Sequence, residues 1–273
     1  MTPEVIQTAK RALEMAATER GIKPSSDALR FMLAQVLAES AFGAATSTLR
    51  GTNNYGAIHS TDSFRRAHAG KANWGEIAHQ DHLASGKRYI EWFRLYPSQL
   101  DGARDFVATV SHLTNLAELS SADQYARDLY EGHYFVGFGQ TDEERITGYK
   151  TFIEAHLPAI DAGLRANALP SDPSAVSVGP FATLLERLYV KTDDVARTVY
   201  GKAFDDVLAS GGVRWFAANA APPDPGPSPS PTPSPAPSPS PPPTPSRGGW
   251  FGLCVLAALL AALPRIFRLV RGS

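Results

Sequence analysis

A proline-rich tract divides this 273-residue chain into parts that must fold separately. From residue 222 to residue 247 proline alternates mainly with serine, threonine or alanine. Such a segment has no apolar side chains for a core and favours extended polyproline II. At about 3.1 Å per residue it would reach on the order of 75 Å. The tract therefore predicts a semi-rigid stalk, with a proline-rich ligand for an adaptor domain as the alternative.

The segment after this stalk is apolar and ends in basic residues. Its uncharged run from Gly248 to Pro264 is at the short limit for a membrane span. Snorkelling of Arg265 and Arg268 would extend the span to residue 271. We predict a transmembrane anchor over residues 248–271, with its basic C-terminal flank in the cytoplasm and the rest of the chain on the opposite, cell-wall side. The alternative is an amphipathic tail on a membrane surface or on a partner.

Charge and cysteine content exclude several classes of protein. The formal net charge is −1, which gives no electrostatic footprint for a nucleic acid. The single cysteine, Cys254, rules out an internal disulfide framework and a cysteine-based zinc site. Charged residues interrupt the N-terminal segment of 21 residues. This segment is therefore not a signal peptide, and its pattern is typical of an amphipathic helix.

The stretch from Ser25 to Gly43 is the strongest helix signal in the chain. Serine and aspartate at its start offer N-cap oxygens, and Gly43 offers a stop. The apolar residues fall at helical spacing: Leu29, Met32, Leu33, Val36 and Leu37. Glu39 follows at the edge of this stripe, in the last turn. Partial burial and the negative end of the helix dipole both raise the pKa of a carboxyl group there, which favours a general acid. The alternative is a solvent-facing glutamate.

The remaining pattern predicts an α+β fold, mostly helical with a small β-hairpin. Residues 74–96 alternate around Ala84-Ser85-Gly86, which is typical of a hairpin. Helices are expected from Ser98, from about Ser121, and from Thr141 to beyond Leu157. We predict one domain over residues 1–165 and a small helical segment over residues 166–221.

Carboxylates near the hairpin could partner Glu39. A glycosidic bond is cleaved by a protonated carboxyl group together with a second carboxylate that acts as base or nucleophile. The candidates are Asp62, Glu76, Asp81 and Glu91, each of which could equally be a solvated surface charge. His79, Asp81 and His82 do not share one face of a strand, so we predict no metal site, and no motif indicates a cofactor.

Four motifs occur in an order that resembles glycoside hydrolase family 73, the glucosaminidase-type peptidoglycan hydrolases. They are AQVLAESAFG at Ala34–Gly43, NNYGAI at Asn53–Ile58, WFRLYPS at Trp92–Ser98, and GHYFVGFG at Gly132–Gly139. The resemblance covers roughly residues 25–165. It departs from the family at Ala41 and Phe42, where the family has glycine and tryptophan.

The resemblance implies a lysozyme-like fold with a sugar-binding groove. It gives Glu39 the general-acid role and implies sugar contacts for Asn54 and Tyr55, and for Phe42 next to the acid. It implies a tyrosine near the scissile bond, for which Tyr134 matches best and Tyr130 is second. Asp81 aligns best as the second carboxylate, and Glu76 remains an alternative.

The expected function is a membrane-tethered peptidoglycan hydrolase. It would cleave between N-acetylglucosamine and N-acetylmuramic acid, with peptidoglycan strands and a lipid bilayer as its partners. A virion-associated or host-lysis enzyme is one setting for such a chain. The alternatives are a single-acid lytic transglycosylase, a non-catalytic peptidoglycan-binding module on a stalk, and a structural membrane spacer.

Overall fold

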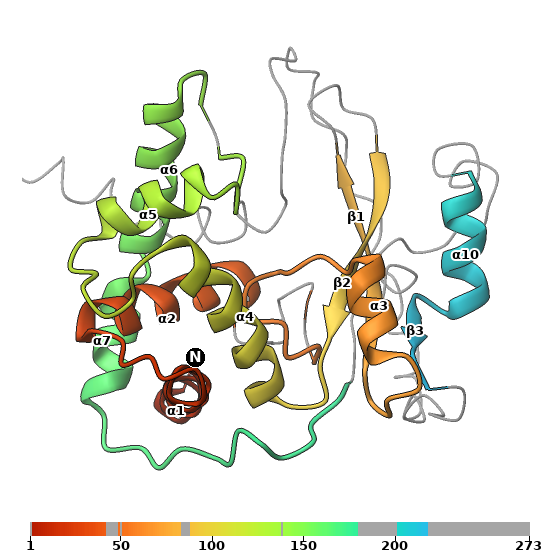
Figure 1. Ribbon diagram of the computed structural model, residues 1–273, viewed down its shortest axis with the longest axis horizontal. Helices are drawn as coiled ribbons and strands as arrows, with labels where there is room; N and C mark the ends of the chain where they lie inside the picture. Colours follow the sequence, from red (N-terminus) through yellow and green to blue (C-terminus); the bar gives the residue numbers. More distant parts are fainter. Residues whose placement is uncertain are drawn as a thin grey trace, which may run out of the picture.

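The computed structural model describes residues 2–41, 49, 51–82, 88–137, 139–179 and 201–217. Within these residues, six helices gather on one side, and a small antiparallel sheet with two further helices lies on the other (Figure 1). The predicted α+β class is confirmed, and the arrangement is consistent with a lysozyme-like fold. The predicted stalk and anchor at residues 222–271 lie outside the described residues.

On the helical side of the molecule, four helices begin where the sequence predicts. The helices of this side are α1 (Pro3–Glu19), α2 (Ser26–Ser40), α4 (Gln99–Leu113), α5 (Ala122–Glu131), α6 (Asp142–Glu154) and α7 (Leu157–Arg165). A serine or threonine caps four of them, its side-chain oxygen accepting a backbone N–H one turn on: Ser25, Ser98, Ser121 and Thr141. These caps fix the helix starts because they satisfy N–H groups that have no partner within the helix.

Helix α2 carries the predicted apolar stripe, but it ends earlier than expected. Met32, Leu33 and Val36 are fully buried. The helix stops at Ala41, which adopts a left-handed conformation with φ of 48° and donates its N–H to the Leu37 carbonyl. The predicted stop, Gly43, lies outside the described residues. Glu39 is therefore one residue from the end of the helix.

The single helix expected from Thr141 to beyond Leu157 is in fact two helices. Helix α6 ends at Glu154, and α7 begins at Leu157 with Pro158 in its first turn. Proline has no N–H to donate and its ring clashes with the preceding turn, so it kinks or ends a helix from within but is tolerated in a first turn, where Pro158 lies in α7.

The predicted hairpin is confirmed as β1 (Gly75–His82) and β2 (Arg88–Leu95). The two strands pair antiparallel from Gly75 opposite Leu95 to His82 opposite Arg88. Helix α3 (Asp62–His68) precedes β1.

A third strand, β3 (Val213–Trp215), pairs antiparallel with the start of β1, giving the order β2-β1-β3. The sequence pattern predicts only helix for residues 166–221. Of that segment the structure describes helix α10 (Lys202–Ser210) and this strand. Three residues are too few to show an alternating pattern, so the strand gives no signal in the sequence. The strand also joins the 166–221 segment to the sheet of the predicted first domain.

The main core lies among the helices, and a smaller one lies against the sheet. Leu13, Met32, Phe106 and Tyr125 are among the fully buried side chains of the main core. Ile77, Phe93 and Leu95 belong to the sheet core. The loop at residues 51–60 runs between these two cores and hydrogen-bonds to β2. Among the described residues no helix is both long and apolar enough to cross a bilayer.

Candidate active site

Glu39 lies half-buried at the C-terminal end of α2. Burial disfavours its charged form and raises the pKa of its carboxyl group from 4.5 to about 7, against the opposing effect of a hydrogen bond from Tyr149. Among the described residues no lysine, arginine or histidine forms an ion pair with it, and residues 42–48 contain no titratable side chain. Glu39 is therefore a carboxyl group that is about half protonated at neutral pH.

Tyr149 on α6 supplies the direct partner of this carboxyl group. Its hydroxyl donates to Glu39 Oε1 at 2.9 Å, and the residue is 8% exposed. The ring of Phe135 stacks on the Tyr149 ring with the centroids 3.8 Å apart and the planes 13° from parallel. None of the sequence motifs assigns Tyr149 to the site. A buried tyrosine needs a partner for its hydroxyl, and that requirement is the signal that could have found it.

Tyr134, for which the resemblance predicts a place near the scissile bond, lies within the electrostatic reach of Glu39. Burial raises the pKa of its hydroxyl well above the ordinary value, and the nearby charge of Glu39 adds to the effect. The hydroxyl donates to the Gly56 carbonyl at 2.8 Å. Tyr125, whose hydroxyl donates to Gln35 Oε1 at 2.5 Å, also lies within the electrostatic reach of Glu39. Glu39 therefore has one direct tyrosine partner, Tyr149, and lies within the electrostatic reach of two more tyrosines from other segments.

Asn54 and Tyr55 face the interior instead of a surface. Each is 2% exposed. The Asn54 amide donates to the carbonyls of Ile58 and Arg94 at 2.9 and 3.0 Å, so it ties the loop to β2. The Tyr55 hydroxyl donates to Gln99 Oε1 at 2.9 Å. These polar groups hold the loop in place, and we do not propose their side chains as sugar ligands.

Two predicted site residues cannot be placed in the cluster. Asp81 lies near the end of β1 with Tyr89 as its partner on β2, but its side chain lies outside the described part of the structure. Phe42 lies outside the described residues altogether. The roles predicted for these two residues stay predictions.

Glu76, the alternative second carboxylate, has a different environment. Its side chain is 1% exposed and lies between two arginines. Arg65 Nε donates to Glu76 Oε2 at 2.9 Å, and Arg214 Nη1 donates to Glu76 Oε1 at 3.1 Å. Arg214 also lies over the Trp92 ring, 3.8 Å from its centroid. Glu76 therefore links α3 and β3 to β1 and has no free oxygen to offer a substrate.

The other two acidic candidates are paired near the surface. Asp62 forms an ion pair with Arg65 at 2.5 Å, and its side chain is 78% exposed. Glu91 lies 3.3 Å from His59 Nε2, with its side chain 19% exposed. Glu91 is therefore the hairpin carboxylate, among those whose side chains the structure describes, that combines partial burial with access to solvent.

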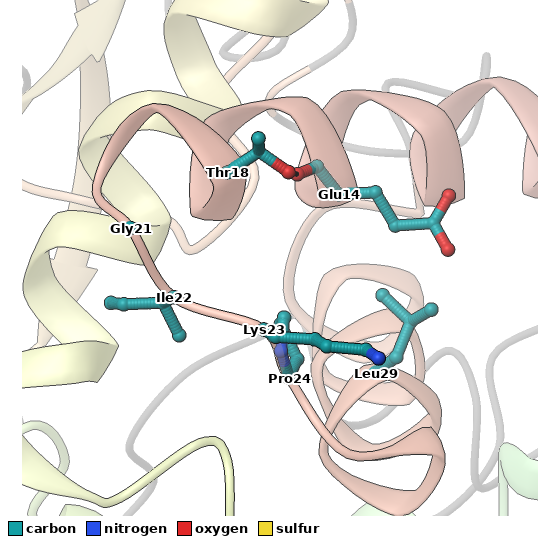
Figure 2. A pocket seen from close by; sticks show the side chains of 7 residues that line it. All are labelled: Glu14, Thr18, Gly21, Ile22, Lys23, Pro24 and Leu29. Carbon is teal, nitrogen blue, oxygen red and sulfur yellow. Dashed lines mark hydrogen bonds between the residues drawn. The ribbon is translucent and has the colours of Figure 1, made fainter.

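A separate hollow lies at the other end of α2 (Figure 2). It has a volume of about 590 Å³ and is lined by Glu14, Thr18, Gly21, Ile22, Lys23, Pro24 and Leu29. Leu29 is ten residues before Glu39, which is about 15 Å along a helix. This hollow is therefore distinct from the Glu39 cluster.

The cluster has the composition of a proton-donating site. A carboxyl group with a pKa near 7 can give up its proton to a leaving oxygen at neutral pH and take one back afterwards. The tyrosine hydroxyl at 2.9 Å can stabilise the carboxylate that remains.

No family model matches the sequence, and no curated protein matches it either. Among solved structures, the chain is similar to a peptidoglycan hydrolase from Sphingomonas sp. A1, with 19% identity and a TM-score of 0.43 over 62% of this chain and 99% of that one. It is similar to the glycoside hydrolase domain of Salmonella typhimurium FlgJ, with 19% identity and a TM-score of 0.37 over 59% and 90%. It is also similar to the catalytic domain of the autolysin Auto from Listeria monocytogenes, with 16% identity and a TM-score of 0.38 over 57% and 85%. All three similarities are at sequence identities below 20% and TM-scores below 0.5.

Proposed function

We propose that this chain is a glycosidase that cleaves the glycan strand of peptidoglycan, with Glu39 as its general acid. The observation that carries the proposal is the state of Glu39, a half-buried carboxyl group with a pKa of about 7. The four sequence motifs that resemble glycoside hydrolase family 73 support peptidoglycan as the substrate. The bond between N-acetylglucosamine and N-acetylmuramic acid is the proposed point of cleavage.

Glu39 would protonate the glycosidic oxygen as the bond to the sugar breaks. General-acid catalysis of this kind contributes about 10²- to 10⁴-fold to a rate. The positive charge that develops on the sugar ring requires a second group. We propose Asp81 for that role, and Glu91 as the alternative, since Glu76 is held by two arginines. Tyr134 would position the sugar or shield the positive charge that develops on it.

The test is Glu39→Gln, assayed on purified peptidoglycan. The amide keeps the shape of the side chain but has no proton of suitable acidity to donate. We expect hydrolysis to fall by at least about 10²-fold, with the circular dichroism spectrum unchanged. Glu14→Gln is the matched control, because Glu14 is a helical glutamate that pairs with Lys10 away from the cluster. Activity of Glu39→Gln close to wild type would remove Glu39 from the mechanism.

Mass spectrometry of the released fragments would separate the alternatives. New reducing ends at N-acetylglucosamine support the proposed bond, and reducing ends at N-acetylmuramic acid indicate a muramidase. Anhydro products, together with unchanged activity in Asp81→Asn and Glu91→Gln, indicate a single-acid transglycosylase. Binding of peptidoglycan without any released fragment indicates a non-catalytic binding module.

The pH dependence offers an independent test. Because Glu39 must carry a proton to act as an acid, its active form is lost as the pH rises through about 7. Activity should then fall about tenfold for each pH unit above that value. A rate that stays level from pH 6 to pH 9 would contradict the assignment.

We further propose that the chain is tethered to a membrane by residues 248–271, with the catalytic domain on the cell-wall side, in a bacterial envelope or a virion. The apolar run behind the stalk supports this proposal. A chain that ends at residue 221 should be released from the membrane fraction, whereas the full chain should resist alkaline extraction. Protease treatment of intact cells or particles would digest an outward-facing domain; a protected domain would reverse the orientation.

A further inference from the structure

The hydroxyl that contacts Glu39 comes from a ring that has little freedom to move. Tyr149 is buried on α6, and Phe135 lies flat against its ring at 3.8 Å. Phe152 flanks the ring at 6.0 Å, one turn further along α6. A change of χ1, which is the rotation that would move the Tyr149 hydroxyl, would also break the flat stacking on Phe135. The hydroxyl is therefore held at 2.9 Å from Glu39 Oε1 by the packing of its own ring.

Phe135 is in turn held from both sides. Its neighbour Tyr134 donates to the Gly56 carbonyl at 2.8 Å. That contact is close, since a Cβ added at Gly56 would lie 2.3 Å from the Tyr134 hydroxyl oxygen. On the other side the Tyr130 ring lies 5.5 Å from Phe135. The loop that carries Phe135 is thus fixed to both the 51–60 loop and α5.

Three hydroxyl groups in the described part of the chain interact with the charge of Glu39. They belong to Tyr125 on α5, Tyr134 in the loop and Tyr149 on α6. All three are neutral near pH 7, because burial raises their pKa values well above the ordinary range. Of the three, Tyr149 is the one that the structure shows donating a hydrogen bond to the carboxyl group. A donor hydrogen bond favours the ionised carboxylate and so opposes the effect of burial.

We propose that Tyr149 and Phe135 form a positioning pair that sets the proton affinity of Glu39. Tyr149 donates to the carboxylate that remains after Glu39 has given up its proton, and Phe135 keeps that hydroxyl in place. The catalytic consequence rests on the proposed function, but the effect on the titration of Glu39 does not.

The experiment is a ¹³C NMR titration of glutamate-labelled, full-length protein. The Glu39 carboxyl signal is identified as the one missing from Glu39→Gln. In Tyr149→Phe the midpoint of this signal should rise by about 1 pH unit, because a hydrogen bond to the charged form is lost. A midpoint that stays the same or falls would overturn the proposal.

Two further variants make the result specific. Phe135→Leu keeps an apolar side chain beside Tyr149 but removes the flat stacking, so the midpoint should rise by a smaller amount; no change would remove Phe135 from the pair. Tyr96→Phe is the matched control, since Tyr96 is a fully buried tyrosine that donates to a different carboxylate, Asp105 Oδ2. The Glu39 midpoint should be unchanged in Tyr96→Phe, and an equal rise there would mean that any buried hydroxyl has this effect.

The outcomes distinguish this inference from the proposed function. Wall hydrolysis that persists in Glu39→Gln would remove Glu39 from the proposed mechanism and leave the titration result intact. If both hold, Tyr149→Phe should shift the basic limb of the pH–rate profile upward by the same amount as the NMR midpoint. A purely structural role for Tyr149 would lower activity without moving that limb.

Discussion

Two glutamates in this molecule are withdrawn from solvent and yet suit opposite purposes. Glu39, at the end of α2, has a tyrosine hydroxyl as its partner and a pKa near 7. Glu76, on β1, is more deeply buried but lies between the guanidinium groups of Arg65 and Arg214. Burial by itself penalises both charges. The partners decide the outcome, because two cations stabilise a carboxylate whereas one neutral hydroxyl compensates only part of the cost.

The comparison explains why burial alone does not identify a functional carboxyl group. Glu76 is 0% exposed, so burial alone would favour it over Glu39 as the functional carboxyl group. Both of its oxygens are already used in hydrogen bonds that connect α3, β1 and β3. The carboxyl group that remains available for chemistry is the less buried one, which lacks a described cation.

The largest effect on stability is expected from Glu76→Gln. The amide leaves two guanidinium groups, which are 35% and 33% exposed, without the counter-charge that they share. Loss of one partner of a buried ion pair costs about 3–5 kcal/mol, and because solvent reaches both guanidinium groups we expect the free energy of unfolding to fall by an amount near the lower end of this range. Urea denaturation at pH 7 measures the change. A loss below about 1 kcal/mol would mean that Asp62 and Asp206, the other partners of these arginines, suffice.

Glu39→Gln should raise the free energy of unfolding at alkaline pH, in contrast to Glu76→Gln. The native state keeps a proton on Glu39 up to about pH 7, whereas the unfolded chain releases it near 4.5. Wild-type stability therefore falls as the pH rises through this window, by up to about 3 kcal/mol. The variant lacks this loss, so it should be equal to wild type at pH 4 and more stable at pH 8. Denaturation curves at the two pH values test the sign, and a variant that is less stable at pH 8 would contradict it.

Arg214→Gln should give the smallest change. Arg65 still pairs with Glu76 in this variant, so the carboxylate keeps one cation. We expect the free energy of unfolding to fall by about 1–2 kcal/mol. This loss includes the stacking of Arg214 on the Trp92 ring, which glutamine cannot replace. Hydrogen exchange of the β3 amides should increase more than that of α2. Equal effects in Arg214→Gln and Glu76→Gln would mean that the two arginines are not independent partners.

Local patterns predicted most of the secondary structure of this chain. The caps at Ser25, Ser98 and Thr141 and the alternation of residues 74–96 depend on contacts within a few residues, so they can be read directly. The position of Glu39 at the end of an apolar stripe is local in the same sense. The β3 strand and the break before Pro158 show the limits, because a three-residue strand has no pattern and a proline can either kink or end a helix.

The sequence by itself determined the class of fold and the glutamate at the end of α2. Tertiary structure decided which side chains surround each carboxyl group: Tyr149 is 110 residues from Glu39, and Arg214 is 138 residues from Glu76. It also turned Asn54 and Tyr55 inward. A pKa depends on charges and hydrogen bonds within a few ångströms in space, and no spacing along the chain encodes those distances when the partners lie on different elements.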